Sequence, residues 1–105
     1  MRRTFLARML ALPVLGLSTS QPASARRMKI LIKSAWGSAD PTQATFPFHH
    51  ANAFADAGHE VRIFLLGEAV SLMRSVVAGS VIPVGWAPLS EAMAKVVAHK
   101  VPIHV

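Results

Sequence analysis

Short apolar strand patterns alternate with helical patterns along this chain, and the alternation limits the possible folds more than any other feature of the sequence. Four runs have the β-branched, apolar character of buried strands, at residues 29–34, 60–66, 81–84 and 101–105. A long segment separates each run from the next, and crossovers of this kind join parallel strands. We therefore expect a small three-layer α/β fold, with a parallel sheet and helices on both faces.

The segment after the first strand carries a helix start and a helix stop. Asp40 can accept hydrogen bonds from free amides at an N-cap, and Pro41 suits the first helical position. Gly58 is the usual left-handed terminator of a helix. We therefore expect a helix from Pro41 to about Ala57, with a kink at the internal Pro47. Its apolar stripe is formed by Ala44, Phe48, Ala51 and Ala55.

Two further helices are expected in the second half of the chain. The first runs from Glu68 to Ala78 and is closed by Gly79, and the acidic residue at its start complements the helix dipole. The second runs from Leu89 to His99. The residues expected to face inward are Val70, Met73 and Val77 on the first helix, and Leu89, Met93, Val96 and Val97 on the second.

Residues 1–25 follow the order of a secretory signal peptide. A basic start precedes an apolar stretch that ends at Leu17, and Ala23-Ser24-Ala25 is a small-x-small cleavage site. The run Arg2-Arg3-Thr4-Phe5-Leu6 also fits the twin-arginine export pattern. The uninterrupted apolar part is far shorter than the ~20 residues of a membrane-spanning helix, so we expect no stable membrane insertion.

Two cellular locations of the protein are compatible with this pattern. If the chain is exported, cleavage after Ala25 leaves residues 26–105 as a periplasmic domain, and this is the interpretation we favour. If translation instead starts at Met28, just before the first strand, the protein is cytoplasmic.

The distribution of charge and the absence of cysteine exclude several classes of function. Lys and Arg outnumber Asp and Glu by 11 to 5, but part of this excess lies in residues 1–25 and most of the rest is scattered. A nucleic-acid interface needs a clustered basic face with aromatic platforms, so we expect no nucleic-acid partner. The 105 residues contain no cysteine, and hence neither a disulfide nor a nucleophilic thiol.

Five stretches of the sequence, taken together and in order, resemble the DsrE/DsrF family. The resemblance covers essentially all of residues 28–105 and implies a Rossmann-like domain that forms homo-oligomers, either trimers or hexamers. Some members act in sulfur relay and carry a persulfide on a cysteine, which implies a sulfur-carrier protein as a partner and no cofactor. The stretches are 28–32, 40–49, 57–70, 81–89 and 101–105.

In the family pattern, Cys-Gly-x-Cys and a helix follow the last strand directly, whereas this sequence ends at Val105. The resemblance therefore implies a reactive residue just after Val105, and a final helix or strand that is missing. A UGA codon for selenocysteine, another kind of truncation and a genuine short product remain open. No catalytic residue can be assigned within the 105 residues.

Two functions are compatible with these observations. The first is sulfur relay, or thiol or selenol redox handling, of the kind that the resemblance implies. The second is a non-catalytic oligomeric module that binds a small ligand or a protein, because the fold alone does not determine function.

Four residues are candidates for a substrate pocket, since an open parallel sheet binds ligands beyond the carboxyl ends of its strands. Trp36 and Trp86 lie in loops that follow strands, although subunit packing or loop anchoring is the interpretation we favour for them. Asp40 directly follows the first of these loops, where the helix opens. His104 is nearest the presumed reactive position, where it would tune a thiol or selenol.

The remaining polar residues are not expected to form a site. His49 and His50 are neighbours on a helix and point about 100° apart, so they cannot share a metal ion, and we expect no metal site. The loop at Gly37-Ser38 has neither the glycine pattern nor the lysine of a nucleotide-binding loop, so we expect no nucleotide cofactor.

Overall fold

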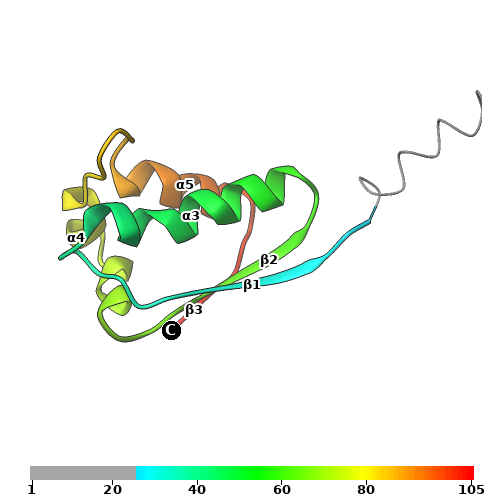
Figure 1. The fold of residues 1–105 in the computed structure, drawn as a ribbon, viewed down its shortest axis with the longest axis horizontal. Coiled ribbons are helices and arrows are strands. Elements are labelled where there is room, and N and C mark those ends of the chain that lie inside the picture. Colours follow the sequence, from blue (N-terminus) through cyan, green and yellow to red (C-terminus); the bar gives the residue numbers. More distant parts are fainter. Residues whose placement is uncertain (1–25) are drawn as a thin grey trace, which may run out of the picture.

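The computed structural model describes residues 26–105, and the predicted signal peptide lies outside the described residues. Figure 1 shows a parallel sheet with two long helices lying along it. The α/β class that the sequence predicted is confirmed. The elements are β1 (Lys29–Ser34), α3 (Pro41–Asp56), β2 (Glu60–Leu65), the 3-10 helix η2 (Gly67–Met73), α4 (Ser75–Ser80), α5 (Leu89–Ala98) and β3 (Ile103–His104).

The described sheet has the strand order β1-β2-β3, and both neighbouring pairs are parallel. In the register, Ile32 lies beside Ile63, and Ile63 lies beside Ile103. The next position across the sheet is occupied by Phe64 and His104. The strands therefore end together at one edge, which is where helices α3 and α5 begin.

Both long helices pack on the same face of the sheet (Figure 1). Burial alternates along the strands: Val61, Ile63 and Leu65 are buried, whereas Leu31 and Arg62 on the opposite face are exposed. The strand order explains this arrangement, because two right-handed crossovers that step in the same direction bring both helices to one face. Among residues 26–105, the prediction of helices on both faces is therefore met on one face only.

Helix α3 begins and ends close to where the sequence predicted. Asp40 is its N-cap and accepts a hydrogen bond from the backbone N–H of Gln43, and Pro41 occupies the first turn. Gly58 has a φ of 93° and follows the last turn in the left-handed conformation. The predicted stripe faces the core: Ala44, Phe48 and Ala51 are fully buried, and Ala55 is partly buried.

The predicted helix from Glu68 to Ala78 is wrong as a single element. The chain forms η2 and α4 instead, with Arg74 in an extended conformation between them. Ala69 and Leu72 are the buried residues of η2, and their spacing of three matches the period of a 3-10 helix. Two predicted inward residues, Val70 and Met73, are exposed, and Gly79 lies inside α4 rather than closing a helix.

The predicted strand at residues 81–84 is also wrong. Pro83 has no N–H to donate to a neighbouring strand, and Ile82 and Val84 are exposed. The N–H of Val84 donates to Oγ1 of Thr42 on α3, which fixes the segment against that helix instead of the sheet. The predicted strand at residues 101–105 shortens to β3, which takes the place beside β2.

Helix α5 has the predicted start and a slightly different inward face. Leu89 and Val96 are fully buried, Met93 is partly buried, and Val97 is 67% exposed. Ala92 takes the buried position instead. One apolar core therefore joins α3, α5, η2 and the covered face of the sheet, and its largest fully buried side chains include Phe48, Ile63, Leu65, Leu72 and Leu89.

Candidate functional site

The carboxyl edge of the sheet is the first place to look for a site, because ligands of open parallel sheets bind there. Strand β1 ends at Ser34 and β2 at Leu65, and the N–H of Leu66 donates to the carbonyl of Ser34 across this edge. Strand β3 ends at His104 at the same edge. All four predicted site residues lie on β3 or on segments that begin at this side of the molecule (Figure 1).

Trp36 lies in the loop that follows β1. Its backbone N–H donates to Oγ of Ser34, and its side chain is 50% exposed. The next residue, Gly37, packs against η2 so closely that an added Cβ would lie 2.8 Å from the carbonyl oxygen of Glu68. The loop therefore has a fixed position, and Trp36 is held at the surface.

Asp40 is engaged in holding helix α3. Its Oδ1 accepts the N–H of Gln43 at 3.1 Å, and its own N–H donates to the carbonyl of Gly37. The side chain is half-buried. The N-cap role predicted from the sequence is therefore present, and it uses one oxygen of this carboxylate.

Trp86 packs on α3 within an aromatic cluster. Its ring centroid lies 4.3 Å from that of His49 and 5.3 Å from that of Phe46, the latter in an edge-on arrangement. Phe46 in turn stacks on His50, with a centroid distance of 5.8 Å. We call Phe46, His49, His50 and Trp86 the aromatic cluster. It anchors the loop before α5, although Trp86 remains 42% exposed.

The sequence analysis considered His49 only as a metal ligand beside His50 and did not expect it to form a site, yet it packs against Trp86 in this cluster. Burial is the main factor that lowers its pKa, and the positive charges of Lys95 and His50 lower it further. Its Nε2 is buried and has no hydrogen-bond partner among the described residues. The helical spacing of Phe46, His49 and His50 was the one available signal, because it places their side chains on neighbouring parts of one helix surface.

His104 lies on the uncovered face of the sheet. It pairs in register with Phe64, which pairs with Lys33, so these three side chains belong to the same face. His104 is exposed, and so is Val105 after it. No hydrogen bond, ion pair or ring contact of the described residues joins two of the four predicted site residues. They therefore share one side of the molecule without forming a closed constellation.

A groove of about 460 Å³ lies at the opposite, amino edge of the sheet. It is lined by His59, which directly precedes β2, by Arg62 of β2, and by His99 and Lys100, which follow α5. Sequence reasoning did not predict this groove, because its basic residues are scattered along the chain and meet only in the fold.

No group of three His, Asp or Glu side chains in residues 26–105 is placed to hold a metal ion. None of the helices described is long and apolar enough to cross a membrane.

Comparison with known proteins gives one result. The model of the DsrE/DsrF-like family matches residues 28–105, which is nearly all of the described chain. Neither a curated protein nor a solved structure matches the sequence.

Proposed function

The chain belongs to the DsrE/DsrF-like family, and from this membership we propose that it acts in sulfur relay or in thiol or selenol redox handling. The family match supports sulfur relay as a general role. The donor, the acceptor and the reactive residue of this chain go beyond what the match supports.

We place the reactive chalcogen directly after Val105. The position of β3 is the observation that carries this proposal: it runs parallel to β2 and delivers the chain to the carboxyl edge. The 105 residues contain no cysteine, so a thiol or selenol of this polypeptide has to come from codons beyond Val105. At that position it would be exposed to a partner, since His104 and Val105 are both exposed.

His104 would act on that group through its charge or its N–H. A cation or hydrogen-bond donor beside a thiol favours the anionic, nucleophilic form and so lowers the pKa of the thiol. His104 has no hydrogen-bond partner among the described side chains that would compete for this role. Sulfur transfer to a carrier protein would then occur at the open edge.

A homo-oligomer, a trimer or a hexamer, is part of the proposal. Helices α4 and α5 expose apolar side chains, among them Val76 at 83% and Val97 at 67%. A hollow of about 240 Å³ between these helices is lined by Ala78, Met93 and Val97. Apolar surface of this kind is a common feature of subunit contacts. Light scattering should therefore give a trimer or larger, and a stable monomer at micromolar concentration would contradict this.

A non-catalytic binding module is the second candidate. The observation in its favour is that the 105 residues contain no thiol.

For location we propose the periplasm after removal of residues 1–25, with cytoplasmic synthesis from Met28 as the alternative. The mature amino terminus of the protein from its host separates the two, because export predicts Arg26 as the first residue.

The coding sequence after Val105 tests the proposed function. A cysteine codon, or a UGA codon followed by codons for Gly-x-Cys, is the expected result. A codon for a residue without sulfur or selenium at that position, with no cysteine in the codons that follow, would favour the binding module and contradict sulfur relay.

A further inference from the structure

We propose that the groove at the amino edge of the sheet binds a small dianionic oxyanion group of the sulfate or phosphate type. Arg27, Arg62 and Lys100 would be its charged ligands. The site lies at the opposite edge of the sheet from the one used in the proposed function and does not depend on that proposal.

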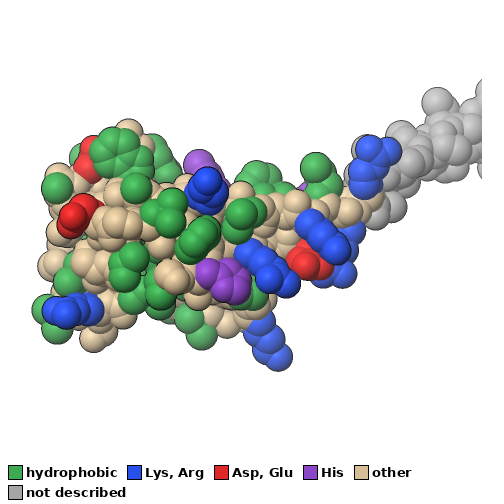
Figure 2. All heavy atoms as spheres, turned by 90° about the horizontal axis from the view of Figure 1, so that it is seen from below, with side chains coloured by type: hydrophobic (Ala, Val, Ile, Leu, Met, Phe, Trp, Pro, Cys, Tyr) green, Lys and Arg blue, Asp and Glu red, His purple; other side chains and the backbone are tan. Residues whose placement is uncertain are grey.

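The groove is large enough for a small ligand and is predominantly basic. Its volume of about 460 Å³ lies within the range of roughly 300–1,000 Å³ typical of ligand sites. Figure 2 shows blue side chains gathered at the end of the molecule where β1 begins, with red carboxylate atoms among them. The basic lining residues are Arg27, His59, Arg62, His99 and Lys100, and the acidic one is Glu60.

Glu60 does not neutralise the groove. Its Oε1 lies 3.8 Å from a terminal nitrogen of Arg27, a long separation for an ion pair, and both side chains are substantially exposed. Such a contact leaves most of the guanidinium donors of Arg27 free for another acceptor. No ion pair of the described residues involves Arg62 or Lys100. Three positive side chains therefore face the groove against one carboxylate.

The two histidines of the groove differ in their hydrogen-bond partners. Nδ1 of His59 accepts the backbone N–H of Met28 at 3.1 Å, so the proton of the neutral ring lies on Nε2, which can donate. His99 contacts Asn52 and Asp56 through its two ring nitrogens. His59 can therefore add a neutral hydrogen bond to an anion, whereas His99 is already engaged with the protein.

Helices α3 and α5 both end at this groove, and exposed carbonyls at a helix end repel anions. Here two of those carbonyls on each helix are capped. The N–H groups of Lys100 and Val101 donate to the carbonyls of Val97 and Val96, which are the two bonds of a Schellman motif. Helix α3 ends in the same way around Gly58. The cations at the groove are therefore not needed to satisfy these two carbonyls at the end of either helix.

Lys100 occupies a backbone conformation that favours glycine. Its φ is 61°, and it is the one non-glycine residue with a positive φ in the part of the chain that the structure describes. The equivalent position after α3 is Gly58, with a φ of 93°. A lysine at this position brings a charged side chain to the groove at the cost of backbone strain. This is the pattern expected of a residue retained for binding rather than for stability.

Titration of the full-length protein with sodium sulfate tests the proposal, with sodium chloride at equal ionic strength as the reference. Sulfate should raise the unfolding midpoint saturably and above the chloride curve. Lys100→Gly and Arg62→Gln should each weaken sulfate binding roughly tenfold. Lys95→Gln is the matched control, because Lys95 is exposed on α5 outside the groove and its loss should leave the affinity unchanged.

Two results would overturn the proposal: an equal response to sulfate and chloride, or a sulfate affinity that neither groove variant changes. Circular dichroism verifies that the variants fold. If Arg62→Gln does not fold, the sulfate affinity of Lys100→Gly alone decides the question. Inorganic phosphate and adenosine monophosphate then separate the two sources of such a group. Tighter binding of phosphate identifies a free anion, and tighter binding of the nucleotide identifies an anionic group on a larger molecule.

Discussion

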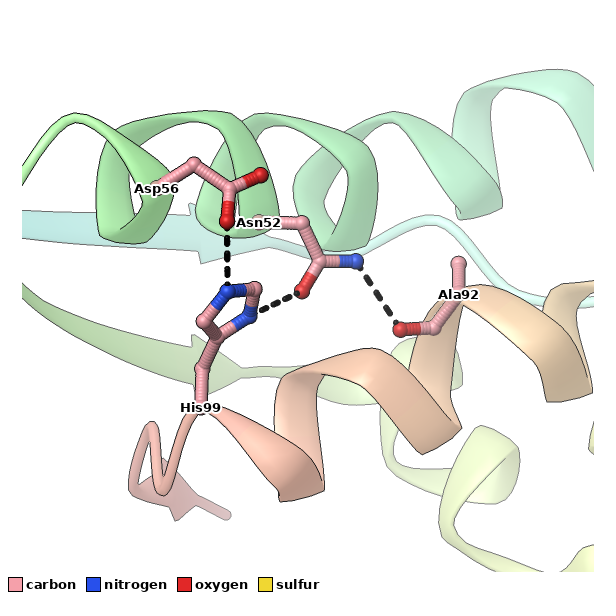
Figure 3. Close-up of polar contacts among 4 residues, drawn as sticks. All are labelled: Asn52, Asp56, Ala92 and His99. Carbon is pink, nitrogen blue, oxygen red and sulfur yellow. Dashed lines mark hydrogen bonds and ion pairs between the residues drawn. The ribbon is translucent and has the colours of Figure 1, made fainter.

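Oδ1 of Asp56 lies 2.7 Å from Nε2 of His99, and this contact joins the last turn of α3 to the C-cap of α5 (Figure 3). The other ring nitrogen of His99 lies 3.1 Å from Oδ1 of Asn52. The Asn52 amide nitrogen donates to the carbonyl of Ala92 at 3.0 Å, which turns the amide oxygen toward the histidine. Both ring nitrogens of His99 therefore face side-chain oxygens of α3.

Asn52 should contribute more to stability than Asp56. The Asn52 side chain is buried, and Asn52→Ala removes the partner of Nδ1 of His99 and of the Ala92 carbonyl, which should cost about 1–3 kcal/mol. Asp56 is 72% exposed, so Asp56→Asn should cost less than about 1 kcal/mol. Urea denaturation measures both. A larger loss in Asp56→Asn than in Asn52→Ala would show that the exposed ion pair, not the buried amide, joins the helices.

Gly37 should tolerate no side chain. In Gly37→Ala the new Cβ would lie 2.8 Å from the Glu68 carbonyl oxygen and 2.9 Å from its Cβ, so the loop after β1 or the start of η2 has to move. We expect a loss of about 1–3 kcal/mol in the free energy of unfolding. Gly79→Ala is the control, since Gly79 lies inside α4 with open space around it and should gain roughly 0.5–1 kcal/mol. Equal effects of the two changes would refute the close packing at Gly37.

Lys100→Gly should stabilise the protein while weakening the groove. Removal of the side chain relieves the left-handed strain at φ 61° and should raise the free energy of unfolding by about 1 kcal/mol. Gly58→Ala makes the reverse change after α3, at φ 93°, and should lower it by a similar amount, about 1 kcal/mol. Denaturant titration measures both variants, and a shift of the two midpoints in the same direction would contradict this account.

The environment of His49 makes stability depend on pH. Burial is the main cause that lowers its pKa in the folded state below the ordinary histidine value of about 6.5, followed by the charges of Lys95 and His50. The unfolded chain therefore takes up a proton first as the pH falls, and stability decreases below about 6.5 and continues to fall through the folded pKa. The contribution of the neutral His49 ring to stability is fully present above about pH 6.5.

His49→Gln should flatten that dependence. The urea midpoint of the wild type should drop between pH 7.5 and pH 5.5 by more than that of His49→Gln. His50→Gln is the matched control, because His50 is exposed next to His49 and should retain most of the slope. An unchanged slope in His49→Gln would show that other groups are responsible.

The well-predicted parts of the fold are those determined by neighbouring residues. Helix α3 follows from a local N-cap at Asp40 and a glycine after its last turn, and β1 and β2 follow from short β-branched runs. Residues 67–84 were misread because their apolar residues are not all buried. Val76 and Val84 are exposed there, and the missing N–H of Pro83 outweighs the strand character of its neighbours.

The candidate sites likewise combine features that neighbouring residues determine with contacts that only the tertiary fold creates. The cap at Asp40 was predicted from local sequence, whereas the contact of His49 with Trp86 depends on a loop that docks on α3 from a distant part of the chain. The groove around Arg62 and Lys100 likewise joins the ends of elements that are far apart in sequence. Sequence patterns carry no signal for such contacts, because they arise only when β2 and α5 pack side by side with α3.

The central claim is the proposal that this chain carries sulfur at the carboxyl edge of its sheet, directly after Val105. Mass spectrometry of the native protein, incubated with polysulfide and digested, measures this most directly. The account predicts a cysteine or selenocysteine next to Val105 whose peptide gains one sulfur atom and loses it to a reductant. A native protein with no such residue after Val105, or one whose residue stays unmodified, would contradict it.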